Sequence, residues 1–279
     1  MSKFNVAIIY DFDGTLARGN LQERSFIPDI GMTKEDFWKE VQERAKIEDA
    51  DEILVYMNLM LRRAAKSRRF SREELEAHGK KADLFSGLEK GDWFKRINKF
   101  GKSKSLNISH YIVSSGIEEM IKGCSISQFF SHIFASKFIY NDDGLASWPG
   151  NAVNYTTKTQ YLFRINKGIM NTWDHRKLNS FMPEYKRATP FENMIFIGDG
   201  DTDVPTMKML NYKGGTSIAV YEEDEKKVHN LIADGRVNFV APADYREGSP
   251  LEIQVKGAVG RISRSIEEGG FIPPTPPAP

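Results

Sequence analysis

Cysteine is nearly absent from this sequence, since Cys124 is the only one among 279 residues. A single cysteine excludes an intrachain disulfide and any metal site built from a cluster of cysteines. This usage is typical of a reducing compartment, and we expect a cytoplasmic protein.

Long apolar runs are also missing, because nowhere do about 18 apolar residues follow one another. No membrane-spanning helix is therefore expected. The apolar run at Phe4–Tyr10 is too short for the core of a signal peptide, and it lacks a small-residue cleavage site.

Neither sign of charge is in excess, with 39 Lys and Arg against 38 Asp and Glu. The overall charge therefore gives no indication of a nucleic-acid or membrane partner. Hydrophobic residues make up 40% and charged residues 28%, as in ordinary globular proteins, so most of the chain should fold. We interpret the densest basic run as a solvated helix face, with attraction of a phosphorylated substrate as the alternative. This run comprises Arg62, Arg63, Lys66, Arg68, Arg69 and Arg72.

Short apolar runs bounded by turn residues predict buried parallel strands. They lie at Phe4–Tyr10, Ile108–Val113, Ile133–Ala135, Met194–Ile197, Ser217–Val220 and Val237–Val240. Helical patterns separate or follow most of them, at Ile117–Lys122, Thr159–Ile169, Pro205–Leu210, Glu222–Ile232 and Leu251–Ile266. This alternation predicts an α/β fold, a doubly wound parallel sheet with helices on both faces.

One stretch, from about residue 20 to residue 91, breaks the alternation with several helix signals and no convincing strand. Thr33 with Asp36, and Ser71 with Glu74, resemble capping boxes at helix starts. We therefore expect a smaller α-helical unit to be inserted between the first two strands.

The predicted domain organisation follows from this insertion. Residues 1–19 and 92–270 should form the core, and residues 20–91 the helical unit. The turn Asn141–Gly144 predicts a hairpin between two short extended pieces, Lys137–Tyr140 and Leu145–Trp148. Five prolines in residues 271–279 predict a frayed or polyproline tail.

The most informative segment is a buried strand that ends in two acids and a Gly-Thr turn. It reads Val6-Ala7-Ile8-Ile9-Tyr10-Asp11-Phe12-Asp13-Gly14-Thr15-Leu16. This pattern places Asp11 and Asp13 at the carboxyl end of the strand, where open α/β sheets bind ligands. Two carboxylates two residues apart repel one another and resist burial unless a cation neutralises them. The segment therefore indicates a metal ion.

The run from Asp11 to Leu16 resembles the first motif of the haloacid-dehalogenase superfamily. The resemblance implies that Asp11 attacks phosphorus to give an aspartyl phosphate, and that Asp13 acts as acid and then as base. The alternative interpretation is an acidic turn that closes a strand.

The second motif of this family is a Ser or Thr that ends the next core strand. Ser114 fits this position in the segment His110-Tyr111-Ile112-Val113-Ser114-Ser115-Gly116, and Ser115 is a near-equivalent candidate. By resemblance, the Ser114 hydroxyl and backbone N–H groups around Ser115 and Gly116 would hold the transferring phosphoryl oxygens. Taken alone this signal is weak, because Ser-Gly marks many strand-to-helix turns.

The third motif is a Lys near the start of a later helix. Lys158 fits, because Thr157 can cap the helix and leave Lys158 in its first turn. The helix dipole disfavours a cation there, so an anionic partner would help to explain the placement. An ordinary surface lysine is the alternative, and Lys167 is a weaker candidate for the same role.

The fourth motif follows another buried strand, in the segment Gly198-Asp199-Gly200-Asp201-Thr202-Asp203. It resembles the Gly-Asp-Gly-x-x-Asp pattern of the family, in which Asp199 would be a metal ligand and Asp203 a supporting acid. Asp201 falls at a variable position of that pattern. A calcium-binding EF-hand loop is the competing interpretation, but Val204 and Leu210 stand where that loop needs Gly and Glu.

These four motifs together imply, by resemblance, a magnesium-dependent phosphatase that hydrolyses a small phosphorylated metabolite. Mg²⁺ would be held by the Asp11 and Asp199 carboxylates and the Asp13 backbone carbonyl, with Lys158 and Asp203 completing the catalytic group. The helical insert would be a cap of the first type, as in the phosphoserine-phosphatase branch. A phosphotransferase or phosphomutase of the same fold is one alternative, and an inactive binding or regulatory protein is another.

The chain departs from that branch in several places. Glu23 is the acid nearest to the branch's substrate-binding Glu, but it follows Asp11 by twelve residues, which is longer than usual. The 41 positions from Lys158 to Asp199 are also many, and the segment 171–190 reads as an extra helical piece of unknown purpose. The substrate and the oligomeric state stay open.

Overall fold

The computed structural model of the chain describes residues 4–64, 70–200, 202–223 and 226–269. Within them the centre is a seven-stranded sheet of order β4-β3-β2-β1-β5-β6-β7. Neighbouring strands are parallel, except for the antiparallel pair β3 and β4, which contains the predicted hairpin. The strands are β1 (Phe4–Tyr10), β2 (Leu106–Ile117), β3 (His132–Tyr140), β4 (Ala146–Asn151), β5 (Met194–Gly198), β6 (Thr216–Tyr221) and β7 (Phe239–Pro242).

Strand β1 lies in the middle of the sheet, and its side chains alternate between two buried faces. Val6, Ile8 and Tyr10 belong to one apolar cluster, whereas Ala7 and Ile9 belong to another. A strand that is covered on both faces has no polar side, which explains why this segment reads as an almost unbroken apolar run.

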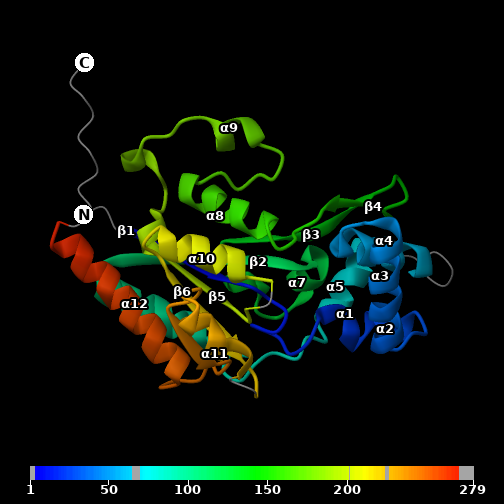
Figure 1. Cartoon of the computed structure of the whole chain (residues 1–279), viewed down its shortest axis with the longest axis horizontal. Coiled ribbons are helices and arrows are strands. Elements are labelled where there is room, and N and C mark those ends of the chain that lie inside the picture. The colour runs from blue at the N-terminus through cyan, green and yellow to red at the C-terminus, as the bar shows by residue number, and fades with distance from the viewer. Residues whose placement is uncertain (1–3, 65–69, 201, 224–225, 270–279) are drawn as a thin grey trace.

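Helices cover both faces of the sheet, which confirms the predicted doubly wound α/β fold (Figure 1). The face with Tyr10 packs against α6 (Asp92–Ser103), α7 (Glu118–Gly123) and α12 (Pro250–Glu267). The face with Ile9 packs against α8 (Thr157–Lys167), α10 (Val204–Tyr212) and α11 (Lys226–Ala233). A short α9 (His175–Asn179) lies in the extra segment after α8.

The helical insert (residues 20–91) gathers beside α7 and the β3–β4 hairpin (Figure 1). Its helices are α1 (Leu21–Arg24), α2 (Phe26–Asp29), α3 (Lys34–Glu48), α4 (Glu52–Ala64) and α5 (Arg72–Gly79). The capping box of α5 is present, with Ser71 and Glu74 each accepting from the other's backbone N–H. Thr33 accepts from the Asp36 N–H at the start of α3. The limits of the insert as a separate domain stay a prediction.

The insert joins the core through two adjacent segments, residues 16–18 and 83–85, which we call the neck. The Arg18 N–H donates to the Asp83 carbonyl at 2.8 Å, and the Phe85 N–H donates to the Leu16 carbonyl at 3.0 Å. The Arg18 guanidinium lies 4.7 Å from the centre of the Phe85 ring. The chain therefore leaves and re-enters the core at one place.

Two arginines of the basic run have structural partners. Arg63 pairs with Glu40, and the Arg72 guanidinium lies 4.4 Å from the centre of the Tyr140 ring. Lys66, Arg68 and Arg69 lie outside the described residues, as do the prolines of the predicted tail. In the described part of the chain, no helix combines the length and the apolar character needed to cross a membrane.

Candidate active site

The carboxyl edge of the sheet brings the predicted residues together. Asp11 follows β1 and Asp199 follows β5. Ser114 lies in β2 where its pairing with β3 shifts register, between Val113 and Ile117. Because neighbouring parallel strands end at the same edge, Asp11, Ser114 and Asp199 line one pocket although they are far apart in sequence.

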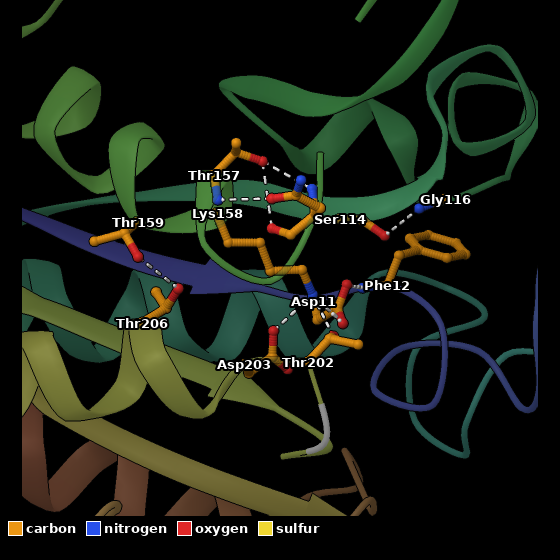
Figure 2. A network of polar contacts seen from close by, with 11 residues as sticks. Asp11, Phe12, Ser114, Gly116, Thr157, Lys158, Thr159, Thr202, Asp203 and Thr206 are labelled. Carbon is orange, nitrogen blue, oxygen red and sulfur yellow. Dashed lines mark hydrogen bonds and ion pairs between the residues drawn. The ribbon is translucent and has the colours of Figure 1, made fainter. Parts of the chain in front are cut away.

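Lys158 joins this group from α8 (Figure 2). Its Nζ donates to Asp11 Oδ2 at 2.7 Å, to Asp203 Oδ1 at 2.6 Å and to Thr202 Oγ1 at 2.9 Å. Burial opposes the charged ammonium, but the negative charges of Asp11 and Asp203 outweigh it and raise the pKa of Lys158. The anionic partners expected for a cation in the first turn of a helix are these two carboxylates.

The start of α8 differs from the prediction in one respect. Thr157 was expected to cap the helix, but it is the first helical residue, and the side chain of the preceding Thr156 accepts no capping bond. Asn154 takes this role, because its Oδ1 accepts from the Thr157 N–H at 3.0 Å. The predicted cap was wrong, whereas the predicted position of Lys158 in the first turn is confirmed.

Asp13 follows Asp11 but is oriented toward the insert. Its Oδ1 accepts from the Leu21 N–H at the start of α1, at 3.0 Å. Burial, followed by the nearby charge of Asp11, raises the pKa of the Asp13 carboxyl to about 7. A carboxyl with a pKa near neutrality can both give and take a proton under ordinary conditions.

Both candidate serines reach the pocket. Ser114 is 1% exposed, and its Oγ accepts from the Gly116 N–H at 3.1 Å. The Ser115 carbonyl accepts from the Tyr56 hydroxyl of α4 at 2.6 Å, while Ser115 Oγ is buried and has no partner among the described residues. The preference for Ser114 over Ser115 as the phosphoryl-binding hydroxyl therefore stays a prediction.

The carboxylates fit a divalent cation. Ligand oxygens of Asp11, Asp199 and Asp203 lie within 4.8 Å of one another. Gly14 adopts a φ of +71°, and a Cβ at this position would lie 2.5 Å from Asp199 Oδ2, so only glycine lets the loop after β1 approach so closely. Hard oxygen donors at this spacing suit Mg²⁺. Asp11 and Asp199 line the pocket, whereas Asp203 is fully buried against Lys158.

Thr202 and the insert residues that face the site were not predicted from the sequence. Thr202 lies inside the fourth motif, where its contact with Lys158 has no sequence signal beyond that motif. The insert residues come from three separate helices or the loops before them, so only the folded arrangement reveals them. They are Asn20, Gln22, Trp38, Glu52, Ile53 and Tyr56.

Glu23, the acid singled out by resemblance, is engaged within the insert. Its Oε1 accepts from Asn20 Nδ2 and from Trp38 Nε1, both at 2.7 Å. Its neighbours Asn20 and Gln22 line the pocket, but Glu23 does not belong to the described lining.

The fold and these motif residues agree with a known family. The chain belongs to the haloacid dehalogenase-like hydrolases, whose family model matches residues 8–208. The match runs from within β1 into α10, and so includes Asp11, Ser114, Lys158 and Asp199.

The chain also resembles individual known proteins. An uncharacterized protein of Borreliella burgdorferi is 29% identical, over 88% of this chain and 93% of its own length. A substrate-bound phosphoserine phosphatase complex superposes with a TM-score of 0.55 at 18% identity, covering 88% of this chain and 97% of that one. A HAD-family hydrolase of Salmonella enterica serovar Typhi gives 0.54 at 18% identity, with coverages of 91% and 71%. These two structures show a shared fold.

Proposed function

We propose that this protein is a magnesium-dependent phosphatase that hydrolyses a small phosphomonoester through an aspartyl phosphate on Asp11. The observation that supports it best is the position of Asp11, which is held by Lys158 and lies within 4.8 Å of Asp199. This combination provides a nucleophile, a buried cation and a metal-binding carboxylate around one pocket.

The first half of the proposed reaction breaks the ester. Asp11 forms a bond to phosphorus while the bond from phosphorus to the leaving alcohol oxygen breaks. Asp13 gives its proton to that oxygen, so the alcohol leaves neutral. The Ser114 hydroxyl and the Lys158 ammonium orient the phosphoryl oxygens and offset their charge.

The second half regenerates the enzyme. Asp13, now ionised, takes a proton from a water that attacks phosphorus, and the bond to Asp11 breaks to release phosphate. Asp11, Asp199 and the Asp13 carbonyl would hold Mg²⁺, which supplies positive charge beside the phosphoryl group. Asp203 keeps Lys158 in place through their 2.6 Å ion pair.

The direct test is Asp11→Asn, assayed for phosphate release from an aryl phosphate with Mg²⁺ present. We expect turnover to fall at least about a thousandfold, because the amide cannot serve as the nucleophile. Circular dichroism should show that the fold is retained. Asp142→Asn, an exposed acid of the hairpin turn, is the matched control and should keep full activity. Substantial magnesium-dependent activity in the Asp11 variant would refute the proposal.

The same assay separates hydrolysis from phosphoryl transfer. A phosphatase releases inorganic phosphate at a rate that added alcohols or sugars leave unchanged. A phosphotransferase would release less phosphate and form a new ester when such acceptors are present.

A further inference from the structure

The pocket above the catalytic carboxylates has a wall that the phosphoryl chemistry does not use. The lower part of the pocket comes from the loops of the core, with Asp11, Ser114 and Asp199. The upper part comes from the insert, with Gln22, Trp38, Glu52, Ile53 and Tyr56. A substrate with its phosphate on Asp11 would place its leaving group against this upper wall.

The charged side chains that line the pocket, among the described residues, are all negative. The described residues around the pocket include four carboxylates and no Lys, Arg or His. Asp11, Asp13 and Asp199 are accounted for by the phosphoryl group and its metal. Glu52, an exposed residue at the start of α4, is left over, and its Oε2 accepts from the Tyr155 hydroxyl at 3.4 Å. A leaving group with a carboxylate would meet a negative charge here, and the described lining offers no cation to balance it.

Aromatic side chains stand next to this acid. The rings of Trp38 and Tyr56 lie edge to face with centres 5.8 Å apart, and Ile53 continues the apolar surface. Aromatic faces beside a carboxylate are an arrangement that attracts organic cations.

Two buried polar atoms near this wall have no partner among the described residues. They are Gln22 Oε1, in a side chain that is 2% exposed, and Ser115 Oγ. A buried acceptor without a hydrogen bond is costly, so a bound donor would be favoured at Gln22. Carboxamide oxygens accept and do not donate, which selects a ligand that carries N–H or O–H groups.

We infer that the leaving group is a small amino alcohol that carries a primary ammonium and no carboxylate. Glu52 balances its charge, the Trp38 and Tyr56 rings pack against its carbon atoms, and Gln22 Oε1 accepts from its N–H groups. This inference rests on the proposed phosphatase function and names its substrate class. We choose Glu52 over Glu23 as the recognition acid, because Glu23 is outside the described pocket lining and its Oε1 is held by Asn20 and Trp38.

Four esters test the inference with the full-length protein and Mg²⁺. They are 2-aminoethyl phosphate, ethyl phosphate, choline phosphate and serine phosphate. We expect kcat/KM for the aminoethyl ester to exceed that for the neutral ethyl ester by about tenfold or more, as one charged hydrogen bond provides. The choline ester has the charge without N–H groups and should fall between them. The serine ester adds a carboxylate and should be poorer than the aminoethyl ester.

The variant Glu52→Gln assigns the preference to its residue. It should lower kcat/KM for the aminoethyl ester relative to that for the ethyl ester, so that the ratio of the two values approaches one. Glu48→Gln, an exposed acid in the last turn of α3 outside the described pocket lining, is the matched control and should preserve the preference. Gln22→Met should narrow the difference between the aminoethyl and choline esters, with its folding checked by thermal melting.

The outcomes distinguish a failure of the amino-alcohol inference from a failure of the proposed phosphatase function. Hydrolysis of all four esters without an amine preference, a preference that survives in Glu52→Gln, or a preference for the serine ester would overturn the inference and leave the phosphatase standing. Absence of hydrolysis of these esters and of an aryl phosphate would remove both.

Discussion

At the residue scale, the buried ammonium of Lys158 is the most demanding group in the molecule. It is 0% exposed and is balanced by two carboxylates that are themselves almost fully buried. Such a triad stabilises the fold only while all three charges are present, because removal of one partner leaves the others unbalanced in a poorly polarisable interior.

We therefore expect Lys158→Met to lower the free energy of unfolding by about 3 kcal/mol, since Asp11 and Asp203 would remain buried without a counter-charge. Urea unfolding followed by circular dichroism measures this loss. Lys95→Met on α6, where the side chain is 63% exposed, should change stability by less than about 0.5 kcal/mol. Equal stabilities of the two variants would contradict the assigned triad.

His110 in β2 belongs to a second buried polar group, which lies on the face of the sheet that carries Tyr10. The Trp93 Nε1–H donates to the Tyr10 hydroxyl at 2.9 Å, so that hydroxyl is free to donate to His110 Nδ1 at 3.0 Å. His110 Nε2 must then carry the proton and donate to Asn98 Oδ1 at 3.1 Å. The network is complete with a neutral imidazole, and burial lowers the pKa of His110 to about 3.

This pKa predicts a loss of stability in acid. The unfolded chain binds a proton at His110 from an ordinary pKa of 6.5 downward, whereas the folded chain does not until about pH 3, so stability falls as the pH falls. Between pH 6.5 and about pH 5 the cost from this residue is about 1.5 kcal/mol. Urea titrations at both pH values should show this difference in the parent protein. The difference should be smaller by that amount in His110→Gln.

Sequence patterns could predict the charged residues of the candidate site because each follows a strand end or begins a helix. Asp11, Ser114 and Asp199 needed only the strand pattern and the family resemblance. Thr202 and Gln22 escaped because their importance depends on which atoms face Lys158 and the pocket, and periodicity says nothing about such contacts.

At the element scale, α5 of the insert and α7 of the core pack with their backbones in close contact. Gly79 faces the backbone of Met120, and Gly123 faces the backbone of Glu76, so a Cβ at either glycine would overlap the opposite chain. The insert is thereby anchored to the core along α5, and the two glycines make this approach possible.

Gly123→Ala should force these helices apart and lower the free energy of unfolding by about 2 kcal/mol, as overpacking does in cores. The control, Gly260→Ala in α12, has the opposite expected sign. Apart from the backbone of its own helix, no atom of the described residues lies within 4 Å of a Cβ at Gly260, so alanine should stabilise the helix by up to about 1 kcal/mol. Thermal unfolding of both variants checks the two signs, and a stabilised Gly123 variant would exclude the close packing.

Sheet elements were predicted better than helices. Strands buried on both faces have apolar runs that mark them directly, as in β1 and β5. Helix α6 was missed, because its buried Trp93, Phe94 and Ile97 alternate with charged residues at the limit of the insert. Strand β7 lies two residues later than predicted, ending at Pro242, since an edge strand tolerates a residue without an N–H.

At the scale of the whole molecule, two polar contacts hold the insert over the pocket. The Tyr56 hydroxyl donates to the Ser115 carbonyl at 2.6 Å, and Asn154 Nδ2 donates to Asp51 Oδ2 at 2.7 Å. Both join the region of α4 to the core, one beside Ser114 and the other just before Lys158. The α5–α7 packing fixes the other side of the insert, so we expect any opening of the pocket to involve α3 and α4.

The double variant Tyr56→Phe with Asn154→Ala should loosen this closure. We expect faster amide hydrogen exchange in α3 and α4, with the strands of the sheet unaffected, because only contacts at the pocket are lost. Ser147→Ala, which removes a hydrogen bond within the exposed hairpin, is the control and should leave exchange in these helices unchanged. Uniform exchange rates in all three proteins would exclude a role of the two contacts in closure.

The neck has a consequence for how such a protein diversifies. Its two segments lie side by side, so the ends of the insert are as close together as the ends of a hairpin loop. Another helical unit spliced between residues 18 and 83 would add little loop-closure entropy, whatever its length. Asp11, Lys158 and Asp203 lie outside the spliced region. On the proposed function, a different insert could change the substrate while these three residues and the loops that carry them stay unchanged.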